Sequence, residues 1–260
     1  MATGSIKIAI NGAAGRMGQR LIDLAGQDGR FTVVCAVEKA GHPLVGKAVG
    51  PGICVDKLTG DVDVVIDFSL PDGTQAILPA AVKAGAAMVI GTTGLLLVQK
   101  QIDEAAKKIP IVQAANYSVG VNVLLKLVAE AARTLGDGYD IEIVEAHHRF
   151  KKDAPSGTAL ALAKSICQAT GKDMQKTLHH GRQGEQPRVA GEIGMHALRL
   201  GDTVGEHAVQ FGSLGETVTL AHSAHTRDTF ALGALRAAAW IVGKPAGKYD
   251  MADVLFGRQD

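Results

Sequence analysis

Two histidines and three cations precede a predicted helix start in residues 145–158, EAHHRFKKDAPSGT. A histidine can give or take a proton near neutral pH, and Lys151 adds a positive charge on a flexible stem. Residues 159–169 are rich in helix formers, so the backbone N–H groups of Gly157 and Thr158 are expected at a helix N-terminus, where they can bind a carboxylate or phosphate. The segment therefore predicts an acid/base and anion-binding site, and a solvated basic loop is the simpler alternative.

Three glycines near the amino terminus predict a second site. Residues 12–18, GAAGRMG, follow the apolar run 6–10 and precede a helical pattern. In a strand, glycine turn and helix of this kind, Gly12 would allow the sharp turn, Gly15 would let the backbone approach a pyrophosphate, and Gly18 would let the helix lie close to the sheet. The spacing is one residue longer than the usual G-x-G-x-x-G, and a glycine-rich turn without a nucleotide is the alternative.

An acidic residue strengthens the dinucleotide interpretation. The apolar run 31–37 predicts the next strand, and Glu38 follows it, 20 residues after Gly18. The dinucleotide-binding fold places there the carboxylate that holds the adenosine ribose hydroxyls. Lys39 beside it could contact a 2′-phosphate, so the sequence predicts binding of NADH and does not exclude NADPH.

Composition limits the function classes. The chain has 260 residues, 47% of them hydrophobic but only 4% aromatic, which favours the aliphatic core of a parallel α/β sheet. A net charge of +1 gives no overall attraction to nucleic acid or to an acidic membrane surface. The three cysteines, Cys35, Cys54 and Cys167, lack metal-ligand or disulfide spacing, which fits a reducing cytoplasm. No segment has the length or pattern of a membrane span or signal peptide.

The order of predicted elements places both sites. Apolar runs at 62–68, 86–90 and 109–112 are each followed by a small polar loop, and helical patterns lie between them. This alternation predicts an α/β fold with a Rossmann-like parallel sheet, whose ligands lie at the carboxyl ends of the strands. The loops 91–94 and 114–118 are therefore expected to face the dinucleotide.

The pattern changes after Ser118. Residues 119–135 predict one long amphipathic helix, and residues 139–146 predict a strand before the basic loop. Three further strand-like segments then crowd together without regular helices between them, at 195–200, 207–211 and 217–222. They predict a second α+β domain with a mixed or antiparallel sheet. A strongly apolar helix at 228–242 needs a surface to pack against.

Five motifs carry a family resemblance: GAAGRMG at 12–18, GTTG at 91–94, NYSVGVN at 116–122, HHRFKKDAPSGT at 147–158 and GEH at 205–207. Together they resemble the 4-hydroxy-tetrahydrodipicolinate reductase (dihydrodipicolinate reductase) family, and the similarity runs nearly end to end. The basic block, 147–158, is the most specific of them. Two departures stand out, since Phe150 replaces a histidine and Lys39 an arginine that many relatives carry.

The resemblance implies an NADH- or NADPH-dependent reduction of a cyclic dicarboxylate in the diaminopimelate route to lysine. It implies a homotetramer formed through the sheets of the second domain, and a last helix that returns to the first. The dinucleotide-binding domain would then be 1–118 completed by 228–260, and the substrate-binding and oligomerisation domain 119–227.

Site residues follow from the same resemblance, which implies no metal. His147 is the implied acid/base residue and Lys151 a proton donor, while His148, Gly157 and Thr158 bind substrate. The implied coenzyme-binding residues are Gly12, Ala13, Ala14, Gly15, Arg16, Met17, Glu38, Lys39, Gly91, Thr92, Thr93, Ala115, Asn116, Tyr117 and Ser118.

Two other functions remain open at this point. A semialdehyde dehydrogenase would need an acylating cysteine, for which Cys167 is the one candidate near the basic loop. A nucleotide sensor without catalysis would keep the glycine turn but would have no need of His147 and Lys151.

Overall fold

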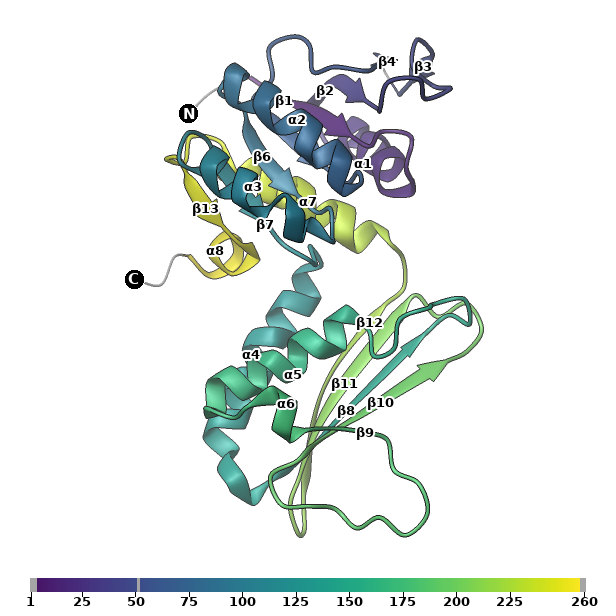
Figure 1. Cartoon of the computed structure of the whole chain (residues 1–260), viewed down its shortest axis with the longest axis vertical. Helices are drawn as coiled ribbons and strands as arrows, with labels where there is room; N and C mark the ends of the chain where they lie inside the picture. Colours follow the sequence, from purple (N-terminus) through teal and green to yellow (C-terminus); the bar gives the residue numbers. More distant parts are fainter. Residues whose placement is uncertain (1–3, 51, 258–260) are drawn as a thin grey trace. The chain divides into compact units, whose positions relative to one another are not determined.

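The computed structural model describes residues 4–50 and 52–257 (Figure 1). The chain divides into two compact units: the first runs to Val119 and resumes at Asp228, and the second runs from Gly120 to Arg227. The expected boundary between 118 and 119 is one residue away from this division. Each unit has its own sheet and core.

The first unit is built on an eight-stranded sheet in the order β13-β7-β6-β5-β1-β2-β4-β3. All its strand pairs are parallel except the antiparallel pair of β3 and β4 at one edge. Consecutive strands diverge to either side of β1, so a crevice is expected at its carboxyl end. The strands are β1 (Ile6–Asn11), β2 (Phe31–Val37), β3 (Ala48–Val49), β4 (Gly52–Val55), β5 (Val64–Asp67), β6 (Ala87–Ile90), β7 (Pro110–Gln113) and β13 (Gly247–Tyr249).

Helices cover both faces of this sheet, which confirms the Rossmann-like architecture. Residues of β5 and β6 are buried throughout, as expected for central strands with helices on both sides. Alternate residues contribute to two apolar clusters, one on each face. One face carries α1 (Arg16–Gln27), α7 (Asp228–Ile241) and α8 (Met251–Phe256), and the other carries α2 (Pro71–Ala84), the 3-10 turn η1 (Leu95–Leu97) and α3 (Gln99–Ala106).

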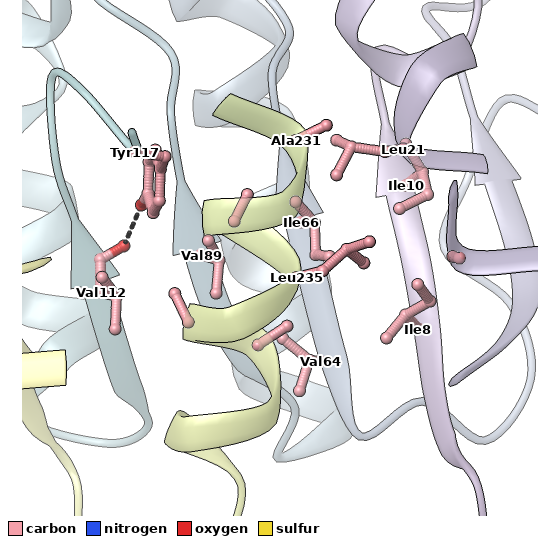
Figure 2. Close-up of a cluster of buried hydrophobic side chains, with 14 of the residues drawn as sticks. Ile8, Ile10, Leu21, Val64, Ile66, Val89, Val112, Tyr117, Ala231 and Leu235 are labelled. Atoms are coloured by element: carbon pink, nitrogen blue, oxygen red, sulfur yellow. Dashed lines mark hydrogen bonds between the residues drawn. The ribbon is translucent and has the colours of Figure 1, made fainter. Parts of the chain in front are cut away.

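The C-terminal helix α7 is part of the first unit. Ala231 and Leu235 are buried among strand residues such as Ile66 (Figure 2). Gly233 permits this close approach, since a Cβ there would lie 1.7 Å from the carbonyl oxygen of Tyr117. The apolar surface that the sequence requires for this helix is therefore the sheet of its own chain.

The second unit has a mixed five-stranded sheet in the order β12-β11-β8-β10-β9. β10 runs parallel to β8 and β9, whereas β11 is antiparallel to β8 and β12. Helices α4 and α5 lie along one face (Figure 1), and their apolar side chains share a core with the sheet. The elements are α4 (Val119–Leu135), η2 (Gly136–Gly138), β8 (Asp140–His147), α5 (Gly157–Thr170), α6 (Met174–Thr177), β9 (Leu178–His180), β10 (Ile193–Arg199), β11 (Gly205–Gly212) and β12 (Thr217–Ala224).

One boundary differs from the sequence prediction in a way that affects the site. β8 continues to His147 instead of ending at Ala146, so the ring is fixed by a strand. α5 begins at Gly157, where the sequence predicts a helix N-terminus, and Ser156 caps it. In the part of the chain that the structure describes, no helix combines the length and apolar character needed to cross a membrane.

Candidate active site

The glycine turn has the backbone that the sequence predicts. Gly12 has φ +78°, a left-handed conformation that favours glycine, and a Cβ there would lie 2.9 Å from the carbonyl oxygen of Phe68. Gly15 is the N-cap residue of α1. The role of Gly18 is different from the one expected, since its Cβ would lie 2.2 Å from the oxygen of Gly12. Gly18 therefore lets α1 pack on the turn itself.

A cavity of about 1090 Å³ opens beside this turn, within the first unit. It lies where the ends of β1, β2 and β5 approach α2, so it occupies the expected crevice. Five of the predicted coenzyme residues line it: Gly12, Ala14, Gly15, Glu38 and Lys39. Charged or titratable residues that sequence reasoning missed also line it: His42, Asp56, Lys57, Asp72 and Lys83.

Glu38 is held against the glycine turn. One carboxylate oxygen accepts a hydrogen bond from the backbone N–H of Ala14 over 3.2 Å, and the other accepts from the N–H of Lys39 over 3.1 Å. These bonds fix the carboxylate at the wall of the cavity, where it can accept hydrogen bonds from ribose hydroxyls.

Other predicted coenzyme residues do not line this cavity. Tyr117 is a buried side chain whose hydroxyl donates to the carbonyl oxygen of Val112 (Figure 2) and also to that of Ile90, so it joins β6 to β7. Burial raises the pKa of that hydroxyl well above its ordinary value. Any ligand contact of Tyr117 therefore involves its backbone. The remaining residues outside the cavity wall are Ala13, Arg16, Met17, Gly91, Thr92, Thr93, Ala115, Asn116 and Ser118.

A buried carboxylate that sequence reasoning missed organises these loops. Asp67, at the end of β5, is fully buried. It accepts hydrogen bonds from the amide of Asn11, from the backbone N–H and hydroxyl of Ser69, and from the hydroxyls of Thr74 and Thr92. It thereby joins the carboxyl ends of β1, β5 and β6 to the start of α2. A carboxylate inside an apolar run was the available signal, but its partners come from distant segments.

In the second unit, His147 is the last residue of β8 and is only 9% exposed. Its Nδ1 lies 2.5 Å from a carboxylate oxygen of Glu145, two residues earlier on the same strand. Burial lowers the pKa of His147 below its ordinary value, and the hydrogen bond with Glu145 opposes that effect. Because a neighbouring carboxylate favours a proton on Nδ1, the Nε2 atom is left to contact a ligand.

Glu145 was not predicted as a site residue, yet it is fully buried beside His147. Its carboxylate accepts two hydrogen bonds from the Arg199 guanidinium, at 2.8 and 2.9 Å, and one from the N–H of Ser156 at 3.0 Å. Burial alone would raise the pKa of Glu145, but the bonds from Arg199 and His147 outweigh it and hold that pKa below its ordinary value. The carboxylate is therefore ionised at neutral pH.

His207 of β11 completes this cluster. Its ring lies edge-on to the His147 ring at 5.1 Å, and its Nε2 lies 3.0 Å from the hydroxyl of Ser156. Burial lowers the pKa of His207 to about 4, so the ring is neutral at neutral pH. The GEH motif signalled this histidine, although no role was predicted for it.

The basic loop places its cations and donors around His147. Lys151 forms an ion pair with Asp153 at 2.9 Å, and this hydrogen bond lowers the pKa of Asp153. The Nδ1 atom of His148 is buried and has no hydrogen-bond partner among the residues that the structure describes. Gly157 is exposed as the first residue of α5, as expected for an anion-binding helix start.

Comparison with known proteins decides the family. Residues 6–117 match the family model described as dihydrodipicolinate reductase, N-terminus, and residues 120–255 match the corresponding C-terminus model. The chain belongs to the dihydrodipicolinate reductase family. It is thus a member of the family that the sequence motifs indicated.

Individual relatives agree over nearly the whole chain. The 4-hydroxy-tetrahydrodipicolinate reductase of Alkalilimnicola ehrlichii is 47% identical over 96% of this chain and 98% of the relative. The reductase of the same name from Pseudoalteromonas translucida is 49% identical, over 96% of this chain and 97% of the relative. A dipicolinate-bound dihydrodipicolinate reductase from Paenisporosarcina sp. TG-14 has the same fold, with a TM-score of 0.77 at 22% identity, covering 97% of this chain and 100% of that one.

The semialdehyde dehydrogenase alternative requires an acylating cysteine, and Cys167 does not suit that role. Cys167 is buried in α5, and burial raises the pKa of its thiol. Thiolate formation is therefore disfavoured, whereas a cysteine nucleophile needs a lowered pKa and access to the substrate.

Proposed function

We propose that this protein is a nicotinamide-dependent reductase that converts 4-hydroxy-tetrahydrodipicolinate to tetrahydrodipicolinate with loss of water, a step of the diaminopimelate route to lysine. The observation that carries this proposal is the match of both family models, which together span residues 6–117 and 120–255. The reductases that are 47–49% identical carry the name of this activity.

The cavity of the first unit fits a dinucleotide. Gly12 allows the tight turn, since a side chain there would collide with the neighbouring backbone, and Gly15 at the N-cap of α1 places a helix start where a pyrophosphate could bind. Glu38 can bind the ribose hydroxyls of NADH, and Lys39, His42 and Lys57 on the same wall offer donors and positive charge to the 2′-phosphate of NADPH. The coenzyme, when bound, supplies a hydride. Backbone groups of the loops 91–93 and 115–118 would complete its binding.

The second unit offers donors for a cyclic dicarboxylate. The buried Nδ1 of His148 and the Lys151 ammonium can each donate to a carboxylate oxygen. The N–H groups of Gly157 and Thr158 lie at the start of α5, where a helix favours anions. This role is supported because the donors that could bind an anion, at a strand end, in a loop and at a helix start, all belong to one short segment of the chain.

We propose that His147 and Lys151 supply the proton that the reaction needs. After the substrate loses water, its ring takes up the hydride at C4, and the resulting enamine takes up one proton. The proposed acids for this proton are Nε2 of His147, at the end of β8, and the Lys151 ammonium in the basic loop, and Lys151 would also stabilise negative charge on the substrate. A sensor that does no chemistry would not need a histidine fixed by a buried carboxylate.

We propose a homotetramer formed through the sheet of the second unit, in the cytoplasm. Helices α4 and α5 cover one face of that sheet, while Gln210, Thr219 and Ala221 are exposed on the other. Sedimentation velocity of the purified chain tests the assembly, and a monomer at micromolar concentration would contradict it.

A coupled assay tests the activity. NADH or NADPH oxidation is followed at substoichiometric enzyme, with substrate generated in place by dihydrodipicolinate synthase. We expect oxidation only when that substrate is present, because the basic loop recognises a dicarboxylate. Comparable kcat/KM with a simple semialdehyde or 2-oxo acid would contradict the proposed function.

A further inference from the structure

His147, the proposed proton donor, is hydrogen-bonded to the buried carboxylate of Glu145. That carboxylate contacts none of the residues expected to bind substrate. Glu145 contacts His147 at Nδ1, on the side of the ring away from Nε2. Its remaining acceptor positions are filled by Arg199, from β10, and by the N–H of Ser156, from the start of α5. A carboxylate with all these partners cannot turn toward a ligand, so Glu145 can affect the reaction only through the groups that it holds, of which His147 is the proposed proton donor.

The free side of the His147 ring faces a glycine. A Cβ at Gly205 would lie 3.1 Å from Nε2 of His147, closer than most van der Waals contacts. Gly205 lies in β11 and does not need a positive φ, since it is absent from the residues with such a conformation. Any side chain at this position would therefore crowd Nε2, and glycine avoids that contact.

The same strand contains a pair of similar chemistry that lacks this arrangement. Glu142 contacts Nε2 of His196 at 2.7 Å and also pairs with Arg188. Its carboxylate is partly exposed and lies on the opposite face of β8, because it is three residues from Glu145. Two features distinguish Glu145 from Glu142: it is fully buried, and the histidine that it contacts faces a glycine with its other nitrogen.

We propose that Glu145 is a positioning residue that accepts the Nδ1 proton of His147 and so directs Nε2 toward the substrate, that Arg199 holds the Glu145 carboxylate in place, and that Gly205 avoids crowding of Nε2. This inference rests on the proposed function, in which His147 transfers a proton. When Nε2 gives its proton to the enamine, the ring becomes neutral and keeps the Nδ1 proton that it donates to Glu145. Solvent then reprotonates Nε2.

The charged groups around His147 act in opposite directions. Glu145, on the same strand, favours the protonated ring, whereas Lys151 from the loop and Arg199 from β10 disfavour it. His207 from β11 is neutral and adds no charge near pH 7. Replacing Glu145 by glutamine would remove the one group that favours the imidazolium, so the protonated fraction of His147 would fall.

The test compares Glu145→Gln with the matched control Glu142→Gln. For Glu145→Gln we expect kcat to fall by about 10²-fold while KM for the coenzyme is unchanged, since a positioned acid is worth about that much. The limb of the kcat/KM profile that requires a protonated donor should move to lower pH, so that part of the loss is recovered there. Glu142→Gln should keep the wild-type profile. A loss of kcat in Glu145→Gln with no movement of the profile would overturn the positioning role.

Two further measurements decide the case if Glu145→Gln does not fold. In wild-type protein with ¹⁵N-labelled histidine, the Nδ1 of His147 should carry a strongly deshielded proton, and an unprotonated Nδ1 would overturn the proposal. Gly205→Ala should lower kcat at least tenfold with the Nδ1 signal intact, because it crowds Nε2 alone; an unchanged kcat would contradict the role of Gly205.

His147→Gln separates this inference from the proposed function. Full activity in that variant would overturn the acid/base role of His147 itself. Strong loss in His147→Gln together with a normal pH profile in Glu145→Gln would overturn only the positioning role. In the double variant, replacing Glu145 should cause no further loss, because its effect passes through His147.

Discussion

Thr92, two residues after the end of β6, donates a hydrogen bond over 3.2 Å to the carboxylate of Asp67, the last residue of β5. Asp67 also accepts from Asn11, at the end of β1, over 2.9 Å. Three parallel strands thus end on one buried carboxylate. The loops that begin there include parts of the predicted coenzyme site, so their positions depend on a side chain that is itself fully buried.

Replacing Asp67 by asparagine should lower both stability and coenzyme affinity. The new amide nitrogen would face hydroxyl and amide donors inside the core, which should cost about 2–4 kcal/mol in the free energy of unfolding. Coenzyme binding should weaken several-fold because the loops lose their common anchor. Urea unfolding and fluorescence titration with NADH measure the two effects.

Asp63→Asn is the matched control for Asp67→Asn. Asp63 is exposed and lies near the opposite end of the same strands. It accepts a hydrogen bond from the backbone N–H of Lys7. It should change unfolding by less than about 1 kcal/mol. Equal effects of the two variants would show that Asp67 has no special organising role.

Replacing Lys151 by glutamine should lower kcat by roughly 10²- to 10⁴-fold, the usual effect of losing a positioned acid or charge donor. NADH and NADPH affinity should barely change, because Lys151 belongs to the second unit and the cavity to the first. Steady-state kinetics and coenzyme titration give both quantities.

Lys152→Gln is the neighbouring control for Lys151. Lys152 is exposed, and its variant should keep kcat within about twofold of wild type. Near-normal kcat in Lys151→Gln would instead return the loop to a solvated basic segment with no catalytic role.

The strands and helices with clear periodicity could be predicted from the sequence. β2 and α4 have the bounds predicted, because an apolar strand and an amphipathic helix of this length determine their own ends. The short strands β4, β9 and β13 were missed. Each has three or four residues and gains its order by pairing with another strand of its sheet, which no local pattern encodes.

The site shows the same division between local and distant information. The positive φ of Gly12 and the start of α5 at Gly157 follow from residues close in sequence. The Glu145–Arg199 pair and the partners of Asp67 depend on segments brought together by the fold, so the sequence showed acidic residues in strands but not what they bind. His42 and Lys57 were missed for the same reason, since β4 brings their loops to the cavity.

His207 should make the protein less stable as pH falls from about 6.5 to about 4. Its folded pKa is about 4 and its ordinary value is 6.5, so between these values the unfolded chain binds a proton that the folded chain does not. Stability from the neutral ring is thus fully present above pH 6.5 and is lost as pH falls toward 4. Over that window the contribution is about 3 kcal/mol, since one pKa unit corresponds to 1.4 kcal/mol.

Urea unfolding by circular dichroism at pH 7, 5.5 and 4.5, together with hydrogen exchange of β11, measures this contribution. His207→Gln should be less stable at pH 7 but should lose less stability on acidification than wild type. His180→Gln, at an exposed position, should keep the wild-type slope. Identical slopes in all three proteins would show that His207 does not stay neutral when folded.

Lys39→Ala should weaken NADPH binding several-fold and leave NADH binding nearly unchanged. Lys39 lies on the cavity wall next to Glu38, whose carboxylate can bind the ribose hydroxyls but repels a 2′-phosphate. An exposed ion pair is worth about 1 kcal/mol, less than one tenfold step in affinity, so neither coenzyme should be excluded. Added salt should weaken NADPH binding more than NADH binding.

Fluorescence titration of wild-type protein and Lys39→Ala with NADH and with NADPH, each at two salt concentrations, measures these affinities. Lys47→Ala, from the same loop but outside the cavity wall, should bind both coenzymes normally, and equal losses for NADH and NADPH in Lys39→Ala would place the discrimination on His42 and Lys57 instead.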